Sequence, residues 1–110
     1  MKIETELIRG AGPTAILELL SGGERYGYEL IEMLERRSDG VLAMGQSTLY
    51  PMLYNLEAKG LIAGRTELAP NGRARKYYRL TRTGEKRLAQ DREQWTALTT
   101  ALGKLGVLGA

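Results

Sequence analysis

Polar and aromatic side chains recur between residues 46 and 55, and their types suit contact with nucleic acid. They are Gln46, Ser47, Thr48, Tyr50, Tyr54 and Asn55. Side chains of these types hydrogen-bond phosphate oxygens and base edges, and they make apolar contact with the methyl group of thymine. An ordinary solvated helix face carries a mixture of Lys and Glu instead. We therefore interpret the stretch as a DNA-contacting surface, with a plain helix surface as the alternative.

A second set of suitable residues is the basic cluster Arg73, Arg75 and Lys76. Between Lys59 and Arg92 there are ten basic and three acidic residues, a net charge of +7. The whole chain carries +3, so the remainder sums to −4. Charge concentrated in this way favours a polyanionic partner. We predict that the cluster contacts phosphates, and a solvated charged turn is the alternative.

The composition argues against an enzyme and against a metal site. The 110 residues include neither Cys nor His, so disulfides, thiol chemistry, His-based catalysis and zinc sites lose their usual residues. We predict no catalytic residues, no metal and no cofactor. Apolar runs are shorter than the ~18 residues that a membrane span needs, and the N-terminus lacks a signal-peptide pattern. We therefore expect a cytoplasmic protein with no membrane partner.

An amphipathic helix positions the polar side chains. Apolar residues recur at positions i, i+3, i+4 and i+7 and so share one helix face opposite the polar one. They are Leu49, Met52, Leu53 and Leu56. Gly60 suits the left-handed conformation that ends a helix. Pro51 fits best in a first turn, so the helix should begin near Gln46 or Ser47.

The basic cluster should lie at the tip of a β-hairpin. Two short β runs, Leu61–Leu68 and Arg75–Leu80, flank a turn with Pro-Asn-Gly chemistry at Pro70–Gly72. The alternation of the second run places Tyr78 and Leu80 toward the core. A hairpin that follows a helix-turn-helix is a wing.

Two helices should precede the polar one. Residues 1–21 have a mostly helical pattern, but Gly10–Pro13 interrupt it, so Pro13 is placed at the start of a shorter helix. Tyr26–Arg37 is the second helix, and Val41–Met44 is a connector with the character of a brief strand. Helix, turn and helix at this spacing predict a helix-turn-helix.

A long helix should follow the hairpin. Thr81 suits its N-cap, and the pattern runs from about Arg82 to about Leu102. Its apolar residues follow the spacing of a coiled-coil seam, at Leu88, Trp95, Leu98, Leu102 and Leu105. A helix that leaves a small head with its own apolar seam needs a partner, and the simplest one is the same helix in a second copy. We therefore predict a dimer interface that contains Leu88, Trp95, Leu98 and Leu102.

These elements predict a mainly α protein with a small β-hairpin. Residues 1–80 form a winged helix-turn-helix DNA-binding domain, and residues 81–110 form a C-terminal dimerisation helix. The chain resembles the PadR-like transcriptional regulators, specifically the short members with a single C-terminal dimerisation helix. The resemblance rests on YGYEL at Tyr26–Leu30, STLYPMLYNLEAKGLI at Ser47–Ile62 and RKYYRLTRTG at Arg75–Gly84. The glycines near Pro13 depart from the uninterrupted first helix that is usual in the family.

The resemblance implies a dimeric cytoplasmic repressor that binds a palindromic operator in double-stranded DNA. The family's DNA-reading helix corresponds to Gln46–Lys59, and Arg75 and Lys76 match its basic wing. Tyr26 and Gly27 match the start of the second helix, where family members approach the DNA backbone; for Tyr26, packing is an equal alternative. Trp95 matches a tryptophan that stacks on flat aromatic ligands between subunits, and plain dimer core is its alternative.

Other function classes stay open at this stage. A winged-helix module that docks another protein without binding DNA is the main alternative, and the asymmetric charge speaks against it. A small-molecule carrier or receptor without a DNA role is a second alternative. An enzyme is a distant third, because no catalytic constellation is visible.

Overall fold

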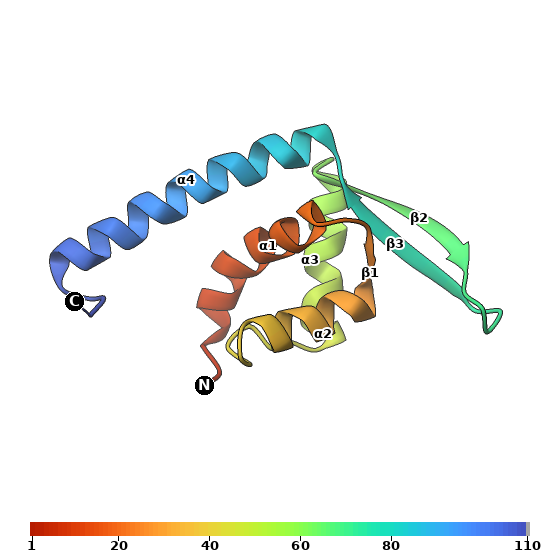
Figure 1. Ribbon diagram of the computed structural model, residues 1–110, viewed down its shortest axis with the longest axis horizontal. Helices are drawn as coiled ribbons and strands as arrows, with labels where there is room; N and C mark the ends of the chain where they lie inside the picture. Colours follow the sequence, from red (N-terminus) through yellow and green to blue (C-terminus); the bar gives the residue numbers. More distant parts are fainter. Residues whose placement is uncertain (110) are drawn as a thin grey trace.

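The computed structural model describes residues 1–109, and residue 110 of the predicted C-terminal segment lies outside the described residues. The helices are α1 (Thr5–Ser21), α2 (Gly27–Arg37), α3 (Gln46–Ala58) and α4 (Arg82–Leu105), and the strands are β1 (Arg25–Tyr26), β2 (Ile62–Leu68) and β3 (Ala74–Leu80). The first three helices form a head, the β2–β3 hairpin extends from it as the wing, and α4 leaves the head on the other side (Figure 1). This architecture confirms the predicted winged helix-turn-helix. None of the described helices is long and apolar enough to cross a lipid bilayer.

The core lies where α1, α2 and α3 meet the base of the wing. Its largest fully buried side chains come from all four elements: Ile16, Leu17, Leu30, Leu49, Leu53, Ile62 and Tyr78. On α3, Leu49, Leu53 and Leu56 are buried and Met52 is half-buried, as the helical spacing predicts. Tyr78 of β3 is buried and Leu80 packs against the core, so the predicted alternation of that strand is confirmed.

Helix α1 is continuous through Pro13, and the expected shorter helix beginning at that residue is wrong. A proline inside a helix removes one backbone hydrogen bond and costs about 3 kcal/mol. Tertiary contacts offset this cost, because Ile8 and Ile16 are buried on either side of Pro13. Gly12 helps by letting α1 approach α3: a Cβ there would lie 2.8 Å from the sulfur of Met52. The glycine that suggested a break therefore belongs to a helix contact.

The wing belongs to a three-stranded antiparallel sheet with the order β1-β3-β2. Tyr26 of β1 pairs with Tyr77 of β3, and Gly64 of β2 pairs with Tyr78. Sequence reasoning missed β1, since two residues are too short to show an alternation. The predicted brief strand at Val41–Met44 is also wrong. That connector forms turns, with the Leu42 amide donating to the Ser38 hydroxyl at 2.9 Å.

Helix α4 starts at the predicted cap. The Thr81 hydroxyl accepts from the Gly84 amide at 3.0 Å and donates to the Gly60 carbonyl at 2.6 Å. The first turns of α4 pack closely on the head, since a Cβ at Gly84 would collide with the Leu61 carbonyl oxygen. The helix ends at Leu105, three residues past the predicted Leu102.

Leu88 is 3% exposed and belongs to the hydrophobic core of its own chain. Its assignment to a dimer interface is therefore wrong, because no second chain can reach a side chain already covered. The seam spacing misled here, since the first turns of α4 are docked on the head. The docking includes an Asp91 carboxylate that accepts from the Thr14 hydroxyl at 2.9 Å and an Arg92–Glu18 ion pair at 2.8 Å.

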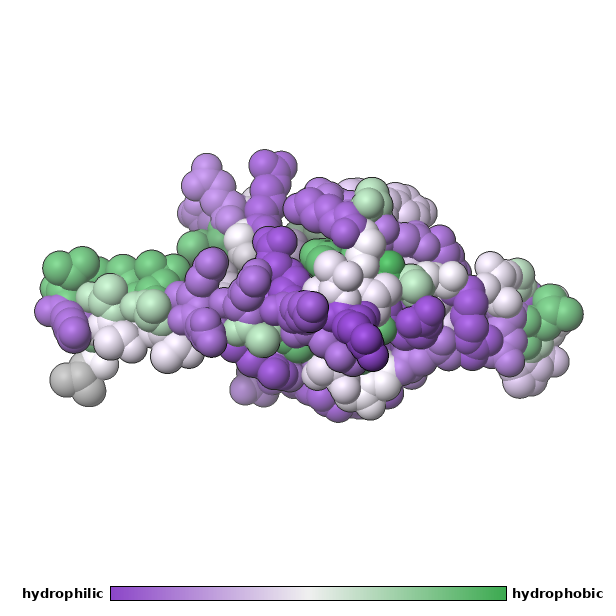
Figure 2. All heavy atoms as spheres, turned by 90° about the horizontal axis from the view of Figure 1, so that it is seen from above, coloured by the Kyte–Doolittle hydropathy of each residue, from purple (hydrophilic) through white to green (hydrophobic). Residues whose placement is uncertain are grey.

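The later turns of α4 project beyond the head. The chain has a radius of gyration of 15.1 Å and extends over 53 × 30 × 21 Å, whereas a compact fold of this length has a radius near 13 Å. Hydrophobic side chains gather on the projecting end (Figure 2), where Leu98 is 47% exposed and Leu105 is 79% exposed. This end of the helix therefore carries apolar surface that its own chain leaves uncovered.

Candidate nucleic-acid interface

Helix α3 turns a polar face away from the core. Gln46, Ser47 and Asn55 are exposed, Thr48 is half-buried, and Tyr54 is 58% exposed. The buried leucines hold the opposite face, so the orientation of these polar groups is fixed by packing rather than by local propensity. The helix begins at Gln46 as expected, but Pro51 lies beyond the first turn. The predicted polar side chains therefore lie on the sides of α3 that its buried leucines leave free.

The start of α2 lies directly against this face. A Cβ at Gly27 would lie 2.6 Å from the hydroxyl oxygen of Tyr50. Tyr50 in turn lies beside Tyr54, with ring centroids 6.2 Å apart. The amide of Tyr26, just before α2, donates to the Glu29 carboxylate at 3.1 Å. Gly27 therefore leaves the space in which the Tyr50 ring is seated.

The wing meets the same region. The Arg75 guanidinium lies 4.6 Å from the ring centroid of Tyr26, within the range of a cation–π interaction. Tyr26 also makes an edge contact with Tyr77, at 5.6 Å between centroids. The Arg73 amide donates to the Asn71 side chain at 3.0 Å at the exposed tip. The contact with Tyr26 places Arg75 beside the residue that precedes α2, while the Arg73 side chain extends into solvent.

A cavity of about 470 Å³ lies between the wing, the start of α2 and α3. Its lining includes six of the residues that the sequence singled out, namely Tyr26, Gly27, Tyr50, Arg73, Arg75 and Lys76. Ser47, Thr48 and Asn55 line a second cavity, of about 510 Å³, on the α1 side of α3. The structure therefore brings the wing and the start of α2 together around Tyr50, and it separates them from the other polar side chains of α3.

The wing's charged groups are more paired than the sequence suggests. Lys76 is not part of an unpaired cluster, since its ammonium group lies 3.0 Å from the Glu57 carboxylate of α3. The hydrogen bond to Glu57 raises the pKa of Lys76 above its ordinary value. Arg65 of β2 pairs with Glu24 at 2.6 Å and with Glu67 at 3.0 Å. The hydrogen bond from Arg65 lowers the pKa of Glu24.

Sequence reasoning missed Glu57 and Gly64 as members of this surface. One signal was available for the pair with Glu57: the alternation that turns Tyr78 inward also turns Lys76 toward α3. Nothing local indicated Gly64, whose role depends on which side chain crosses it. Within residues 1–109, no three side chains of Cys, His, Asp or Glu gather closely enough to hold a metal ion.

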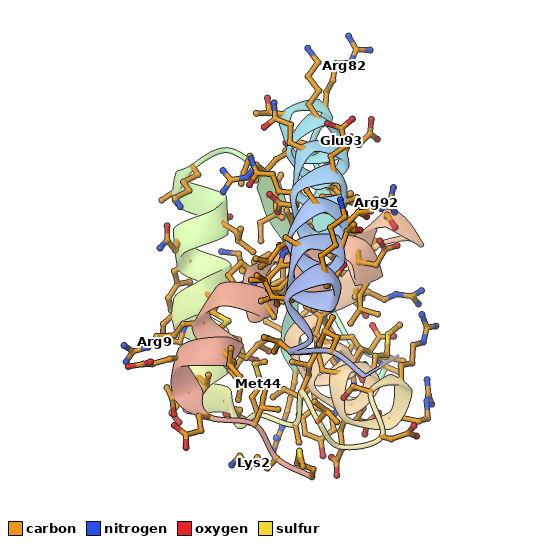
Figure 3. The ribbon with its side chains drawn as sticks, turned by 90° about the vertical axis from the view of Figure 1, so that its left-hand side faces the viewer. Lys2, Arg9, Met44, Arg82, Arg92 and Glu93 are labelled. Atoms are coloured by element: carbon orange, nitrogen blue, oxygen red, sulfur yellow. The ribbon has the colours of Figure 1, made fainter. Side chains whose placement is uncertain are left out.

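Trp95 lies in a cleft of its own chain, where α1, α3 and α4 enclose about 490 Å³. The Trp95 ring is half-buried. The lining comes from the three helices and from the segment that follows α3: Arg9, Gly10, Pro13, Thr14, Leu17, Asn55, Leu56, Lys59, Leu61, Arg87, Asp91, Gln94 and Leu98. Arg9 and Arg92 project to opposite sides of the molecule (Figure 3), and only Arg9 lines the cleft. The cleft connects Trp95 with the last turn of α3 through Asn55.

Comparisons with known proteins agree with this geometry. The model of the transcriptional regulator PadR-like family matches residues 16–90. The transcriptional regulator Rv3488 of Mycobacterium tuberculosis is 37% identical over 87 residues, which are 79% of this chain and 78% of that protein. A transcriptional regulator from Clostridium thermocellum superposes with a TM-score of 0.83 at 32% identity, covering 91% of this chain and 97% of that chain. Bacillus subtilis PadR in complex with operator DNA gives a TM-score of 0.66 at 31% identity, covering 71% of this chain and 44% of that chain.

Proposed function

The chain belongs to the PadR-like family of transcriptional regulators, and we propose that it is a homodimeric repressor that binds a palindromic operator in double-stranded DNA. It is a short member of a regulator family, not an enzyme. The observation that carries the proposal is the convergence of three elements around Tyr50: helix α3, which carries it, the start of α2 and the wing. The operator complex of the Bacillus subtilis relative supports the choice of DNA as partner.

In the proposed complex, α3 enters the major groove and its polar face contacts base edges. Ser47 and Tyr54 lie on the exposed side of the helix, and Thr48, Tyr50 and Asn55 flank them. Gln46, Tyr26 and Gly27 approach the DNA backbone, where the first turns of α2 and α3 lie. The wing contributes phosphate contacts through Arg73 and Arg75, which make the affinity depend on salt. Discrimination between sequences then comes from α3.

The homodimer forms through the projecting part of α4. Leu98 and Leu102 follow Trp95 along the helix, and the exposed Leu105 extends the same stripe. Leu88 contributes to the head instead, so the interface begins about two turns later than the spacing suggested. We assign DNA binding to residues 1–80 and dimerisation to residues 81–110, with the first turns of α4 anchoring the second part on the first. Two α3 helices about 34 Å apart would then reach successive major grooves.

A small planar aromatic effector is the proposed ligand of the Trp95 cleft. The cleft has a volume of about 490 Å³, which is within the range of small-molecule sites. The indole ring of Trp95 provides a face on which an aromatic ligand can stack. The cleft joins α4 to α3, so an occupant could change the separation of the two heads. The effector changes DNA binding only if it binds the dimer more tightly at one separation of the heads than at another.

The decisive experiment is a mobility shift with DNA from the protein's own promoter, compared with random DNA of equal length. We expect a shifted band with promoter DNA and competition by the same unlabelled fragment. Protein that binds neither DNA would support a docking module, or a small-molecule receptor if it binds aromatic ligands. For the effector, a panel of planar aromatic compounds is titrated while Trp95 fluorescence is read, since Trp95 is the single tryptophan of the chain. The absence of quenching by every compound would leave Trp95 as dimer core.

A further inference from the structure

Lys76 of β3 reaches across the neighbouring strand to the recognition helix. Its ammonium group donates to the Glu57 carboxylate, 3.0 Å away on the last turn of α3. The same group lies 5.3 Å from the ring centroid of the buried Tyr78. Both side chains keep substantial exposure, 43% for Lys76 and 32% for Glu57. The contact therefore joins the wing to α3 at the surface that is proposed to face DNA.

The Lys76 side chain passes over Gly64 of β2 on its way to Glu57. A Cβ at Gly64 would collide with Cε of Lys76, and it would lie 3.0 Å from a carboxylate oxygen of Glu57. Gly64 pairs with Tyr78 across the sheet, so the open position lies next to the buried ring. Gly64 has no positive φ that would require glycine. The Lys76 chain crosses the space that Gly64 leaves, so a Cβ there would displace the end of that chain.

We propose that Lys76 and Glu57 form a strut that fixes the angle of the wing to α3, so that Lys76 is a positioning residue and not a phosphate contact. The inference rests on the proposed function, because the angle matters only if both elements bind one DNA molecule. The wing is joined to the head by the sheet at its base, and its outer half, beyond Thr66 and Lys76, has no core residue beneath it except Ala69. The strut joins the wing to α3 at the boundary of this outer half, and Arg75 contacts Tyr26 just beyond it.

The charge of Lys76 supports this role. A phosphate contact releases counterions only if the cation is free to neutralise the phosphate, whereas Lys76 already neutralises Glu57. Lys76 is protonated at neutral pH as any exposed lysine is, and the hydrogen bond to Glu57 raises its pKa further above the ordinary value. Arg73 offers the contrast, since its side chain extends into solvent at the tip of the same wing.

The test compares four variants with the unmodified chain: Lys76→Met, Glu57→Gln, the exchanged pair Lys76→Glu with Glu57→Lys, and Arg73→Met. Glu67→Gln is the matched control, because it removes a carboxylate of the wing that pairs with Arg65 and leaves the strut untouched. Fluorescence anisotropy gives the affinity for promoter and random DNA over a range of salt concentrations. Thermal unfolding confirms that each variant is folded.

We expect Lys76→Met and Glu57→Gln to weaken promoter binding about two- to fivefold, because exposed ion pairs are weak. The salt slope, which is the slope of the logarithm of the binding constant against the logarithm of the salt concentration, should stay unchanged. The exchanged pair should recover most of the loss, while Arg73→Met should lower the salt slope by about one. Tighter promoter binding by Glu57→Gln would overturn the strut and make Lys76 a phosphate contact. The same conclusion would follow from a lower salt slope for Lys76→Met together with no recovery of affinity in the exchanged pair.

A measurement without DNA separates the strut from the proposed function. Nuclear magnetic relaxation of backbone amides reports motion of the wing tip, at residues 71–74, relative to α1. Loss of the strut should lower the order parameters at the tip in both single variants and restore them in the exchanged pair. Unchanged tip motion in Lys76→Met would refute the strut. Failure of the unmodified chain to bind promoter DNA would refute the proposed function alone.

Discussion

Replacing Gly27 by alanine should weaken DNA binding through a residue that the substitution does not alter. The added Cβ would lie 2.6 Å from the Tyr50 hydroxyl oxygen, whereas ordinary contacts begin at 3.4 Å, so the hydroxyl must move by about 0.8 Å, the difference of the two. The Tyr50 ring lies between α2 and Tyr54, so it moves out of the position from which it is proposed to contact DNA. A lost base contact costs about 1–3 kcal/mol, or about 5- to 150-fold in affinity.

The free energy of unfolding should fall by about 0–3 kcal/mol in the same variant. Glycine to alanine in a helix favours folding by up to about 1 kcal/mol, whereas the forced movement costs about 1–3 kcal/mol. Gly10→Ala is the matched control, because a Cβ at Gly10 meets no atom within 4 Å. That variant should be slightly stabilised and bind DNA normally.

Anisotropy titrations with promoter and random DNA, together with urea unfolding, measure both effects. Adding Tyr50→Phe to Gly27→Ala should relieve part of the strain, since the nearest remaining ring atom would be Cζ at 2.9 Å. Promoter affinity of Gly27→Ala within twofold of the unmodified chain, with normal stability, would show that Tyr50 tolerates the movement and would refute the reasoning.

Three further predictions concern charge, assembly and pH. Arg73→Gln should weaken binding to promoter and random DNA alike and lower the salt slope by about one; an unchanged slope in anisotropy titrations would remove the wing tip from the DNA contact. Leu98→Glu should yield monomers in light scattering, whereas Leu88→Ala should lose about 2–5 kcal/mol of unfolding free energy without changing the subunit affinity per folded chain. Because the hydrogen bond from Arg65 lowers the pKa of Glu24, the resulting stability is present above the ordinary pKa of 4.5 and lost as pH falls through the lower, folded-state value. Urea unfolding from pH 6 to pH 3 should therefore show a smaller loss for Glu24→Gln, and equal losses would contradict the pair.

Local patterns of the sequence sufficed for helix α3 and the wing. The apolar spacing of Leu49, Leu53 and Leu56 identified the face that α3 buries, and Thr81 was the correct cap of α4. The order of elements and the mainly helical class followed from these patterns. Such features could be predicted because each depends on residues within a few positions of one another.

The same local reasoning failed where distant residues meet. Gly10–Pro13 looked like a break, but contacts with α3 hold α1 continuous. Leu88 fitted a coiled-coil spacing, but the head covers it. Lys76 looked like a free cation, but it is paired with Glu57, nineteen positions earlier in the chain. In each case the side chain was read correctly by type, and its partner was the missing information.

The sequence by itself therefore determined which faces are apolar, where the helices and the wing occur, and which segment carries the positive charge, because hydrophobic periodicity and turn chemistry are local properties. Only the tertiary structure decided which of those side chains are packed or paired within the chain and which remain available to a partner. Gly27 leaves space for the Tyr50 ring, and the Lys76 chain crosses Gly64 to reach Glu57. Leu88 is buried in the core of its own chain and not exposed on α4. The physical reason is that packing and charge pairing depend on distances between segments, and these distances exist only once the chain has folded.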